Sequence, residues 1–236
     1  MSNTPDSTEL ERVEAPDPGA SIVDGILNSL RAAIVEGILP PGFRLREIPL
    51  SHHFGCSTTP VREALRRLEY DGLVVTYPRR GAEVIAIGGD KLEDLYEIRL
   101  LLECHAAHRA ASIATPDAVD DLREILRRSE RLADSDDLVL LNAADMEFHG
   151  AISGLSGNPV LAELVERVTR QILVMRVRTK ARVPGGPARA HDYHQSILEA
   201  IAEHDPDKAE SLMRDHIEWS AAAVMAALSR RERADV

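Results

Sequence analysis

Apolar and polar positions repeat with a helical period over most of the second half of the chain. From residue 91 onward, apolar residues recur three, four and seven positions apart, which places them on one face of a helix. The last boundary is the clearest, because Asp205 suits an N-cap and Pro206 the first helical position. We expect an antiparallel helical bundle. The pattern predicts about six helices, over residues 91–113, 117–133, 137–155, 158–179, 188–204 and 206–230.

A shorter pattern, two helices joined by a tight turn, occupies residues 48–73. Gly55 interrupts the first helix, and Ser57 to Pro60 opens the second with hydroxyl caps and a proline in its first turn. Val61 and Leu65 face inward. Such an arrangement is typical of DNA-reading proteins, because the open face suits a phosphate backbone and base edges. On or beside that open face lie Thr58, Thr59, Arg62, Arg66 and Arg67.

A hairpin follows the second helix directly. Residues 73–76 and 82–87 read as strands, and residues 77–81 form a tight tip. The tip carries Arg79 and Arg80, where contact with a phosphate or with the minor groove is natural. An arginine pair on a loop is often only a solvated basic turn, but beside a basic helix we favour a DNA-binding wing.

These patterns predict a mainly α protein with two domains. Residues 1–20 are rich in Asp, Glu, Pro and Ser and are expected to form a disordered tail. Residues 21–88 form the predicted winged helix-turn-helix, residues 88–90 a linker, and residues 89–236 the all-helical domain.

The charge is divided unevenly between these parts. The chain carries a formal net charge of −11, yet residues 21–88 hold eight basic and seven acidic residues. The acidic excess therefore lies outside the predicted DNA-binding domain, whose attraction to DNA depends on locally clustered arginines. We expect modest, salt-sensitive affinity, which a homodimer would raise by doubling the contacts.

Composition excludes several other classes of protein. Hydrophobic residues make up 44% and aromatic residues only 3%, which favours packed helices over a sheet sandwich. The sequence shows neither a long apolar run nor a signal-peptide pattern, so we expect a cytoplasmic protein without membrane association. The two cysteines, Cys56 and Cys104, are not expected to form a disulfide; Cys56 could sense redox state but more often such a residue only packs.

Four polar residues point into the predicted bundle. Asp145 and His149 are one turn apart on one helix, and His194 and His216 lie on the apolar stripes of two others. Singly, each reads best as a hydrogen-bonded core residue. Together, one carboxylate and three imidazoles suit a divalent metal, with Zn²⁺ favoured and Ni²⁺ or Mn²⁺ as alternatives.

The first domain resembles the winged helix-turn-helix of GntR-type bacterial repressors. The resemblance rests on Ala32–Gly42, Ser57–Leu65 and Arg79–Gly81. In that family the recognition helix usually begins Ser-Arg-Thr-Pro-Val-Arg, so Thr58 departs from the pattern, as does Ile48 where relatives often place a polar or basic reader. The resemblance implies DNA contacts for Ser57, Thr59, Arg62, Arg80 and Gly81.

The second domain resembles the ligand-binding domain of the FadR-like subfamily. The matching segments are Asp145–His149, Ser156–Asn158, Tyr193–Ile201 and Met213–His216. The resemblance implies that Asp145, His149, His194 and His216 hold a divalent metal beside a cavity for a small carboxylic acid. It also implies that Arg99 lines that cavity, although Arg99 could instead be exposed and paired with Glu103 along its helix.

The predicted function is therefore a DNA-binding transcriptional regulator, with a repressor favoured, that binds a pseudo-palindromic operator as a homodimer and responds to an organic acid. Two alternatives stay open. The first is a metal-dependent hydrolase-like enzyme in which the metal activates water, with Glu147 close in sequence to the ligand helix. The second is constitutive DNA binding with a purely structural metal.

Overall fold

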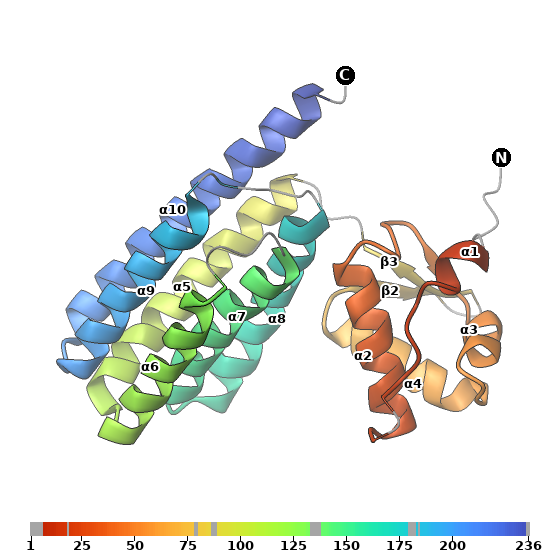
Figure 1. The fold of residues 1–236 in the computed structure, drawn as a ribbon, viewed down its shortest axis with the longest axis horizontal. Helices are drawn as coiled ribbons and strands as arrows, with labels where there is room; N and C mark the ends of the chain where they lie inside the picture. The colour runs from red at the N-terminus through yellow and green to blue at the C-terminus, as the bar shows by residue number, and fades with distance from the viewer. Residues whose placement is uncertain are drawn as a thin grey trace. The chain divides into compact units, whose positions relative to one another are not determined.

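The structure, a computed structural model, describes residues 7–17, 19–77, 80–85, 89–132, 138–178, 183 and 185–234. The chain divides into two compact units, Met1–Ile87 and Gly88–Val236 (Figure 1). The predicted linker at residues 88–90 meets this division, and of its residues only 89 and 90 are described, as the start of a helix.

The first unit is a winged helix-turn-helix, as predicted. Its sheet has the strand order β1-β3-β2 with antiparallel pairing, and Tyr77 pairs with Gly81 at the end of the hairpin. The apolar residues of α4 that were predicted to face inward are buried. The elements are α1 (Ser7–Leu10), α2 (Ile22–Val35), β1 (Arg44–Leu45), α3 (Glu47–His53), α4 (Thr58–Tyr70), β2 (Val74–Tyr77) and β3 (Gly81–Val84).

The start of α4 differs in one detail from the prediction. Ser57 stands at the N-cap with extended backbone, but its side chain makes no capping hydrogen bond. The exposed Ser57 hydroxyl is therefore not engaged at the helix end.

The N-terminal segment also differs from the prediction of a disordered tail over residues 1–20. Residues 1–6 lie outside the described part, but Ser7–Leu10 forms the short helix α1. The side chain of Val13 is buried, and the Val13 carbonyl lies 3.1 Å from Nε2 of His53. A single apolar residue in a polar segment does not predict that the segment is ordered. The burial of Val13 depends on a tertiary contact with α3, which no local pattern specifies.

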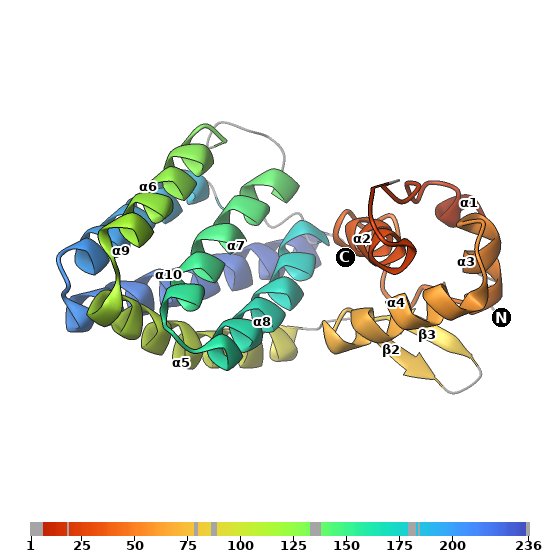
Figure 2. The same cartoon turned by 90° about the horizontal axis from the view of Figure 1, so that it is seen from below.

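The second unit is the predicted helical bundle, with six helices in its described part. Packing contacts place them in the cyclic order α5, α8, α7, α6, α9, α10 and back to α5. In Figure 2, α5 and α8 lie along one edge of the bundle and α6 and α9 along the opposite edge. The helices are α5 (Gly89–Ile113), α6 (Pro116–Glu130), α7 (Leu138–Leu155), α8 (Pro159–Arg178), α9 (Gly186–Ala202) and α10 (Pro206–Ala234).

Local sequence explains several helix ends. The Thr115 side chain accepts a hydrogen bond from the backbone of Ala118 and caps α6. Asp205 accepts one from the backbone of Lys208 at 3.0 Å, directly before Pro206, as predicted. In the part of the chain that the structure describes, no helix is both long and apolar enough to cross a membrane.

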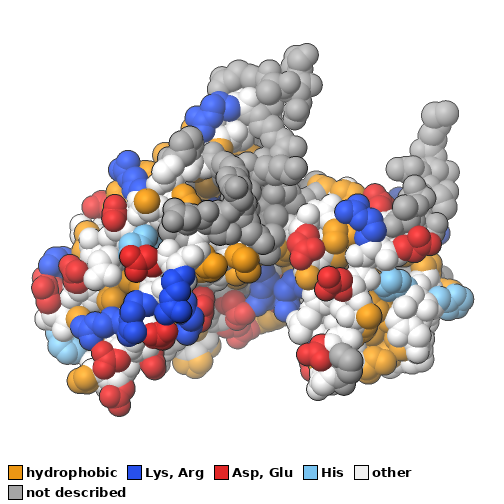
Figure 3. All heavy atoms as spheres, viewed as in Figure 1, with side chains coloured by type: hydrophobic (Ala, Val, Ile, Leu, Met, Phe, Trp, Pro, Cys, Tyr) orange, Lys and Arg blue, Asp and Glu red, His pale blue; other side chains and the backbone are white. Residues whose placement is uncertain are grey.

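The outer face of α6 is a solvated, charge-paired surface. Acidic and basic side chains are interspersed there (Figure 3). Arg123 pairs with Asp120 and Arg127 with Glu124 along the helix. Pairs of this kind contribute only tenths of a kcal/mol each, so this face supports solubility more than stability.

Candidate metal centre and nucleic-acid interface

The four predicted metal ligands meet inside the helical bundle. Asp145 and His149 lie on α7, His194 on α9 and His216 on α10. The three imidazoles are buried, and the Asp145 side chain is largely so. One nitrogen or oxygen from each residue lies within 4.8 Å of the others. The structure thus brings together residues that are 71 positions apart at the extremes.

The ligand atoms converge on one small volume. Nε2 of His216 lies 3.1 Å from Nε2 of His149 and 3.3 Å from Nε2 of His194. Oδ1 of Asp145 lies 3.5 Å from Nε2 of His194 and 3.7 Å from Nε2 of His149. Among the residues that the structure describes, the buried Nδ1 of His216 has no hydrogen-bond partner, so contacts among the imidazoles leave this network incomplete. Three nitrogens and one oxygen facing one another fit a borderline divalent cation.

The surroundings favour the protonation states that metal binding requires. Burial, followed by the positive charge that His149 can carry, lowers the pKa of His194 to about 3. Burial and the neighbouring histidines hold the pKa of His216 well below its ordinary value. Burial alone raises the pKa of Asp145, but Arg176 and the histidines outweigh burial and hold that pKa well below its usual range. Neutral imidazoles beside an ionised carboxylate are the forms that ligate metal.

Arg176 on α8 holds the second oxygen of Asp145. Its Nη1 donates to Oδ2 of Asp145 at 2.8 Å, which leaves Oδ1 facing the histidines. Sequence reasoning missed this residue, because no spacing rule connects Arg176 with a position 31 residues earlier on another helix. The contact fixes the orientation of the carboxylate.

Arg99 and Glu103 form a buried chain that ends on a histidine of the cluster. Arg99 is 1% exposed, and its Nε donates to Oε1 of Glu103 at 2.5 Å. Oε2 of Glu103 lies 2.5 Å from Nδ1 of His149. Burial alone raises the pKa of Glu103, but Arg99 and His149 outweigh it and lower that pKa to about 2. The alternative in which Arg99 is exposed is therefore wrong, although Glu103 is its partner as that alternative supposed.

One nitrogen of the Arg99 guanidinium has no partner. Nη2 is buried and makes no hydrogen bond within the described part of the chain. A buried donor on a charged group is costly to leave unpaired. This nitrogen is therefore a candidate anchor for an anion close to the four-residue cluster.

Glu147, the carboxylate considered as a general base, faces away from the cluster. It is exposed on α7 and pairs with Arg128 of α6. Glu147 is two residues from both Asp145 and His149, and this spacing places it on a different face of the helix.

The predicted DNA contacts on α4 lie on one accessible surface. Ser57, Thr59, Arg62 and Arg66 are exposed, and Thr58 is half-buried. Arg80 is exposed and Gly81 begins β3. Arg79 lies outside the described residues.

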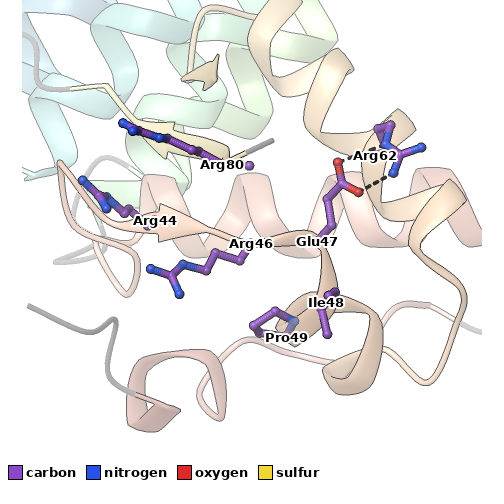
Figure 4. A pocket seen from close by; sticks show the side chains of 8 residues that line it. Arg44, Arg46, Glu47, Ile48, Pro49, Arg62 and Arg80 are labelled. Carbon is purple, nitrogen blue, oxygen red and sulfur yellow. Dashed lines mark hydrogen bonds and ion pairs between the residues drawn. The ribbon is translucent and has the colours of Figure 1, made fainter. Parts of the chain in front are cut away.

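A hollow of about 750 Å³ separates the wing from the start of α3 and the recognition helix (Figure 4). Four arginines line it, and sequence reasoning identified only two of them, Arg62 and Arg80. The other two, Arg44 and Arg46, flank a buried leucine in β1 and are exposed. Their alternation along a two-residue strand was too short a signal to detect, yet it adds two positive charges to this surface.

Glu47 holds Arg62 in place at the edge of the hollow. Nε and Nη2 of Arg62 donate to the two carboxylate oxygens of Glu47 at 2.9 and 2.6 Å (Figure 4). The hydrogen bonds from Arg62 lower the pKa of Glu47. A two-point ion pair fixes the guanidinium plane, so the position of Arg62 is set before any DNA is bound.

Gly81 has a structural reason for being glycine. Its φ is +83°, and a Cβ at this position would collide with the carbonyl oxygen of Leu45 on the neighbouring strand. The close pairing of β1 and β3 therefore requires glycine at this point.

The sequence matches two family descriptions. Residues 22–84 match "Bacterial regulatory proteins, gntR family", and residues 94–218 match "FCD domain". The chain is 30% identical to the Nta operon transcriptional regulator of Aminobacter aminovorans over 179 residues, 75% of this chain and 82% of the relative. It is 27% identical to the HTH-type transcriptional repressor RspR of Escherichia coli (strain K12), over 86% of this chain and 88% of the relative.

A solved structure shows the same fold. E. coli McbR/YncC superposes with a TM-score of 0.75 and 24% identity, covering 87% of this chain and 97% of that chain. Taken together with the family matches, the chain is a bacterial transcriptional regulator of helix-turn-helix type. It belongs to the gntR family, with the FadR-like combination of a winged helix-turn-helix and an FCD domain.

Proposed function

We propose that this regulator binds operator DNA as a homodimer and changes its operator affinity when a small organic acid binds beside a divalent metal ion in the FCD domain. The observation that carries this proposal is the four-residue cluster Asp145, His149, His194 and His216, which Glu103 links to the buried Arg99, whose Nη2 is unpaired among the described residues. A cation site beside a buried anion anchor is suited to a carboxylate.

The four cluster residues would hold the ion through their converging atoms. Zn²⁺ fits this nitrogen-rich set best, and Ni²⁺ or Mn²⁺ accepts the same donors. When bound, the ion would supply positive charge that attracts a carboxylate. Arg176 and Glu103 orient Asp145 and His149 for this role, and Arg99 donates to the effector.

Operator binding uses the surface of α4 and the arginines around the hollow. Arg62, held by Glu47, contacts a DNA phosphate or a base edge. Arg44, Arg46 and Arg80 contact the phosphate backbone of the DNA. The effector shifts the population between two arrangements of the dimer that present the two α4 helices at different spacings. The segment at residues 86–88, through which this shift would pass, lies outside the described residues.

The relative RspR is named a repressor, which supports the same sign of regulation here. A regulator that reads a bacterial chromosome works in the cytoplasm. Binding of the effector would then cause the protein to dissociate from the operator DNA.

The experiment that tests the proposal combines metal analysis of the purified protein with a thermal-shift screen of small carboxylic acids, with and without chelator. We expect a near-stoichiometric divalent metal and an acid that raises Tm only in the metal-loaded protein. If the purified protein contains no metal and no acid raises its Tm, the proposal that the FCD domain senses an organic acid beside a metal is wrong.

A matched variant isolates the anchor. Arg99→Lys keeps a positive charge beside Glu103 but removes the planar fork that binds a carboxylate. We expect full metal content and a lost acid-dependent shift. An unchanged shift would show that Arg99 does not contact the effector.

A further inference from the structure

The most exposed large hydrophobic side chain in the described part of the chain lies among arginines. Ile48, the second residue of α3, is 64% exposed. It lines the same hollow as Arg62 and Arg80 (Figure 4). A single exposed apolar residue is ordinary on a protein surface. An apolar residue surrounded by positive charges, on the surface proposed to bind DNA, raises the question of which apolar group of DNA it meets.

The position of Ile48 is fixed by its neighbours along the chain. Leu50 is buried, and its backbone N–H donates to the carbonyl of Arg46 at 3.1 Å. The Ser51 hydroxyl donates to the carbonyl of Ile48 at 2.8 Å. Pro49 has a restricted φ, and isoleucine in a helix strongly prefers one χ1 rotamer. Ile48 therefore presents a preformed apolar surface and loses little conformational entropy when a partner covers it.

Ile48 lies beside the point where α3 meets the recognition helix. The preceding residue, Glu47, accepts two hydrogen bonds from Arg62 of α4, at 2.9 and 2.6 Å. In a helix-turn-helix the second helix lies in the major groove. Consecutive Cα atoms are about 3.8 Å apart and consecutive bases of a strand about 3.4 Å, so Ile48 lies within about three base pairs of a base that Arg62 meets.

The major groove presents one apolar group, the C5-methyl group of thymine, among hydrogen-bond donors and acceptors. The isoleucine side chain has neither a donor nor an acceptor, so Ile48 cannot recognise a polar base edge by hydrogen bonds. It would instead remove water from such an edge without replacing the lost hydrogen bonds. Ile48 therefore favours thymine and disfavours guanine, cytosine and adenine at the base that it covers.

We propose that Ile48 is a specificity-determining residue that contacts the C5-methyl group of a thymine in the major groove of the operator. This inference rests on the proposed function and deepens it, because it names a base that the DNA-binding surface selects. The neighbouring arginines that contact phosphates position the protein without such a preference. The carbon atoms of deoxyribose are the other apolar groups that DNA presents, but contact with them does not distinguish between bases.

Selection from a random-sequence library of duplex DNA by the full-length protein tests the proposal. We expect the duplexes that the natural protein selects to share a thymine that Ile48→Ala no longer selects. Ile48→Val keeps two methyl groups and should retain the preference. Ile22→Ala, a matched change at a 51% exposed isoleucine that does not line the hollow, should select the same sequences as the natural protein. Selection of the same thymine by Ile48→Ala would overturn the inference.

Deoxyuridine removes the proposed contact from the DNA side, because it pairs like thymidine but lacks the C5-methyl group. In a selected duplex, we expect this replacement to weaken binding of the natural protein by about 3- to 10-fold per half-site, the effect of losing one buried methyl contact. For Ile48→Ala the two duplexes should bind within a factor of about two, because the contact is already lost. If Ile48→Ala weakens binding to both duplexes alike and the natural protein does not distinguish them, Ile48 contacts deoxyribose and the inference is wrong.

Salt dependence separates an apolar contact from a phosphate contact. Ile48→Ala should leave the slope of log affinity against log salt concentration unchanged, whereas Arg62→Ala should reduce it. A reduced slope in Ile48→Ala would mean that the variant displaces phosphate contacts, and would contradict a direct apolar contact. If the natural protein enriches no sequence from the library, the proposed operator binding fails together with this inference. Enrichment that Ile48→Ala leaves unchanged overturns the inference alone.

Discussion

Glu103 and His149 are in direct contact, with Oε2 of the carboxylate 2.5 Å from Nδ1 of the imidazole. The contact is made on the side of the ring opposite to Nε2, which faces the other histidines. Glu103 also binds Arg99, so one buried carboxylate touches both the proposed effector anchor and a proposed metal ligand. Binding of an effector at Arg99 would therefore change the electrostatic environment of His149, and binding of a metal at His149 would change that of Arg99.

We predict that Glu103→Gln weakens metal affinity by about 10- to 100-fold, because an amide fixes the His149 ring and raises its basicity less well than a carboxylate does. Competitive titration against a chelator of known affinity measures the change. Glu97→Gln, an exposed position on the same helix, is the control. Equal affinities in the two variants would show that Glu103 does not act through His149.

We predict that His194→Ala lowers metal content and abolishes the effector response, while basal operator binding survives. The imidazole supplies one of the converging nitrogens of the second unit, whereas the DNA-binding unit has a buried core of its own. Metal analysis and fluorescence anisotropy with operator DNA check the two parts. His191→Ala, one turn earlier on α9, is the control. Full metal content in His194→Ala would remove that residue from the ligand set.

Sequence patterns located the elements and the four-residue cluster, but not the residues that support it. Helix ends such as Thr115 and Asp205 are encoded locally, because the cap residue is adjacent to the backbone it satisfies. The helical period of the apolar residues alone predicts that His194 and His216 face the interior of the bundle. Glu103 and Arg176 could not, because their contacts depend on how α5 and α8 dock against α7, which no local pattern specifies.

The same limit applies in the DNA-binding domain. The turn and the arginines of the recognition helix predict it from the sequence. Arg44 and Arg46, by contrast, come to line the same hollow as Arg62 only through the pairing of β1 with β3. The bonds from Arg62 to Glu47 likewise cross from α4 to α3. Tertiary contacts therefore decide which charges this surface presents.

We predict that Arg62→Ala weakens operator binding by about 10-fold or more and lowers the salt dependence, because a positioned cationic contact is lost. Metal content should not change. Anisotropy titrations at several salt concentrations measure both effects. Arg123→Ala is the control, since Arg123 lies on α6 of the second unit, where it pairs with Asp120. Parallel loss of operator and metal binding would indicate misfolding and contradict a direct contact.

We predict that Gly81→Ala destabilises the winged domain more than Gly42→Ala does. Both glycines have positive φ, +83° and +75°, so each substitution carries the cost of a left-handed backbone, about 1–2 kcal/mol. Nothing lies within 4 Å of a Cβ built on Gly42, whereas one on Gly81 meets Leu45 on the adjacent strand. The clash should add about 1–3 kcal/mol and loosen the pairing of β1 with β3. Denaturant unfolding of the two variants measures this difference directly, and operator binding should fall only for Gly81→Ala. Equal losses of stability would mean that backbone conformation alone, and not the close approach of the strands, sets the requirement for glycine at position 81.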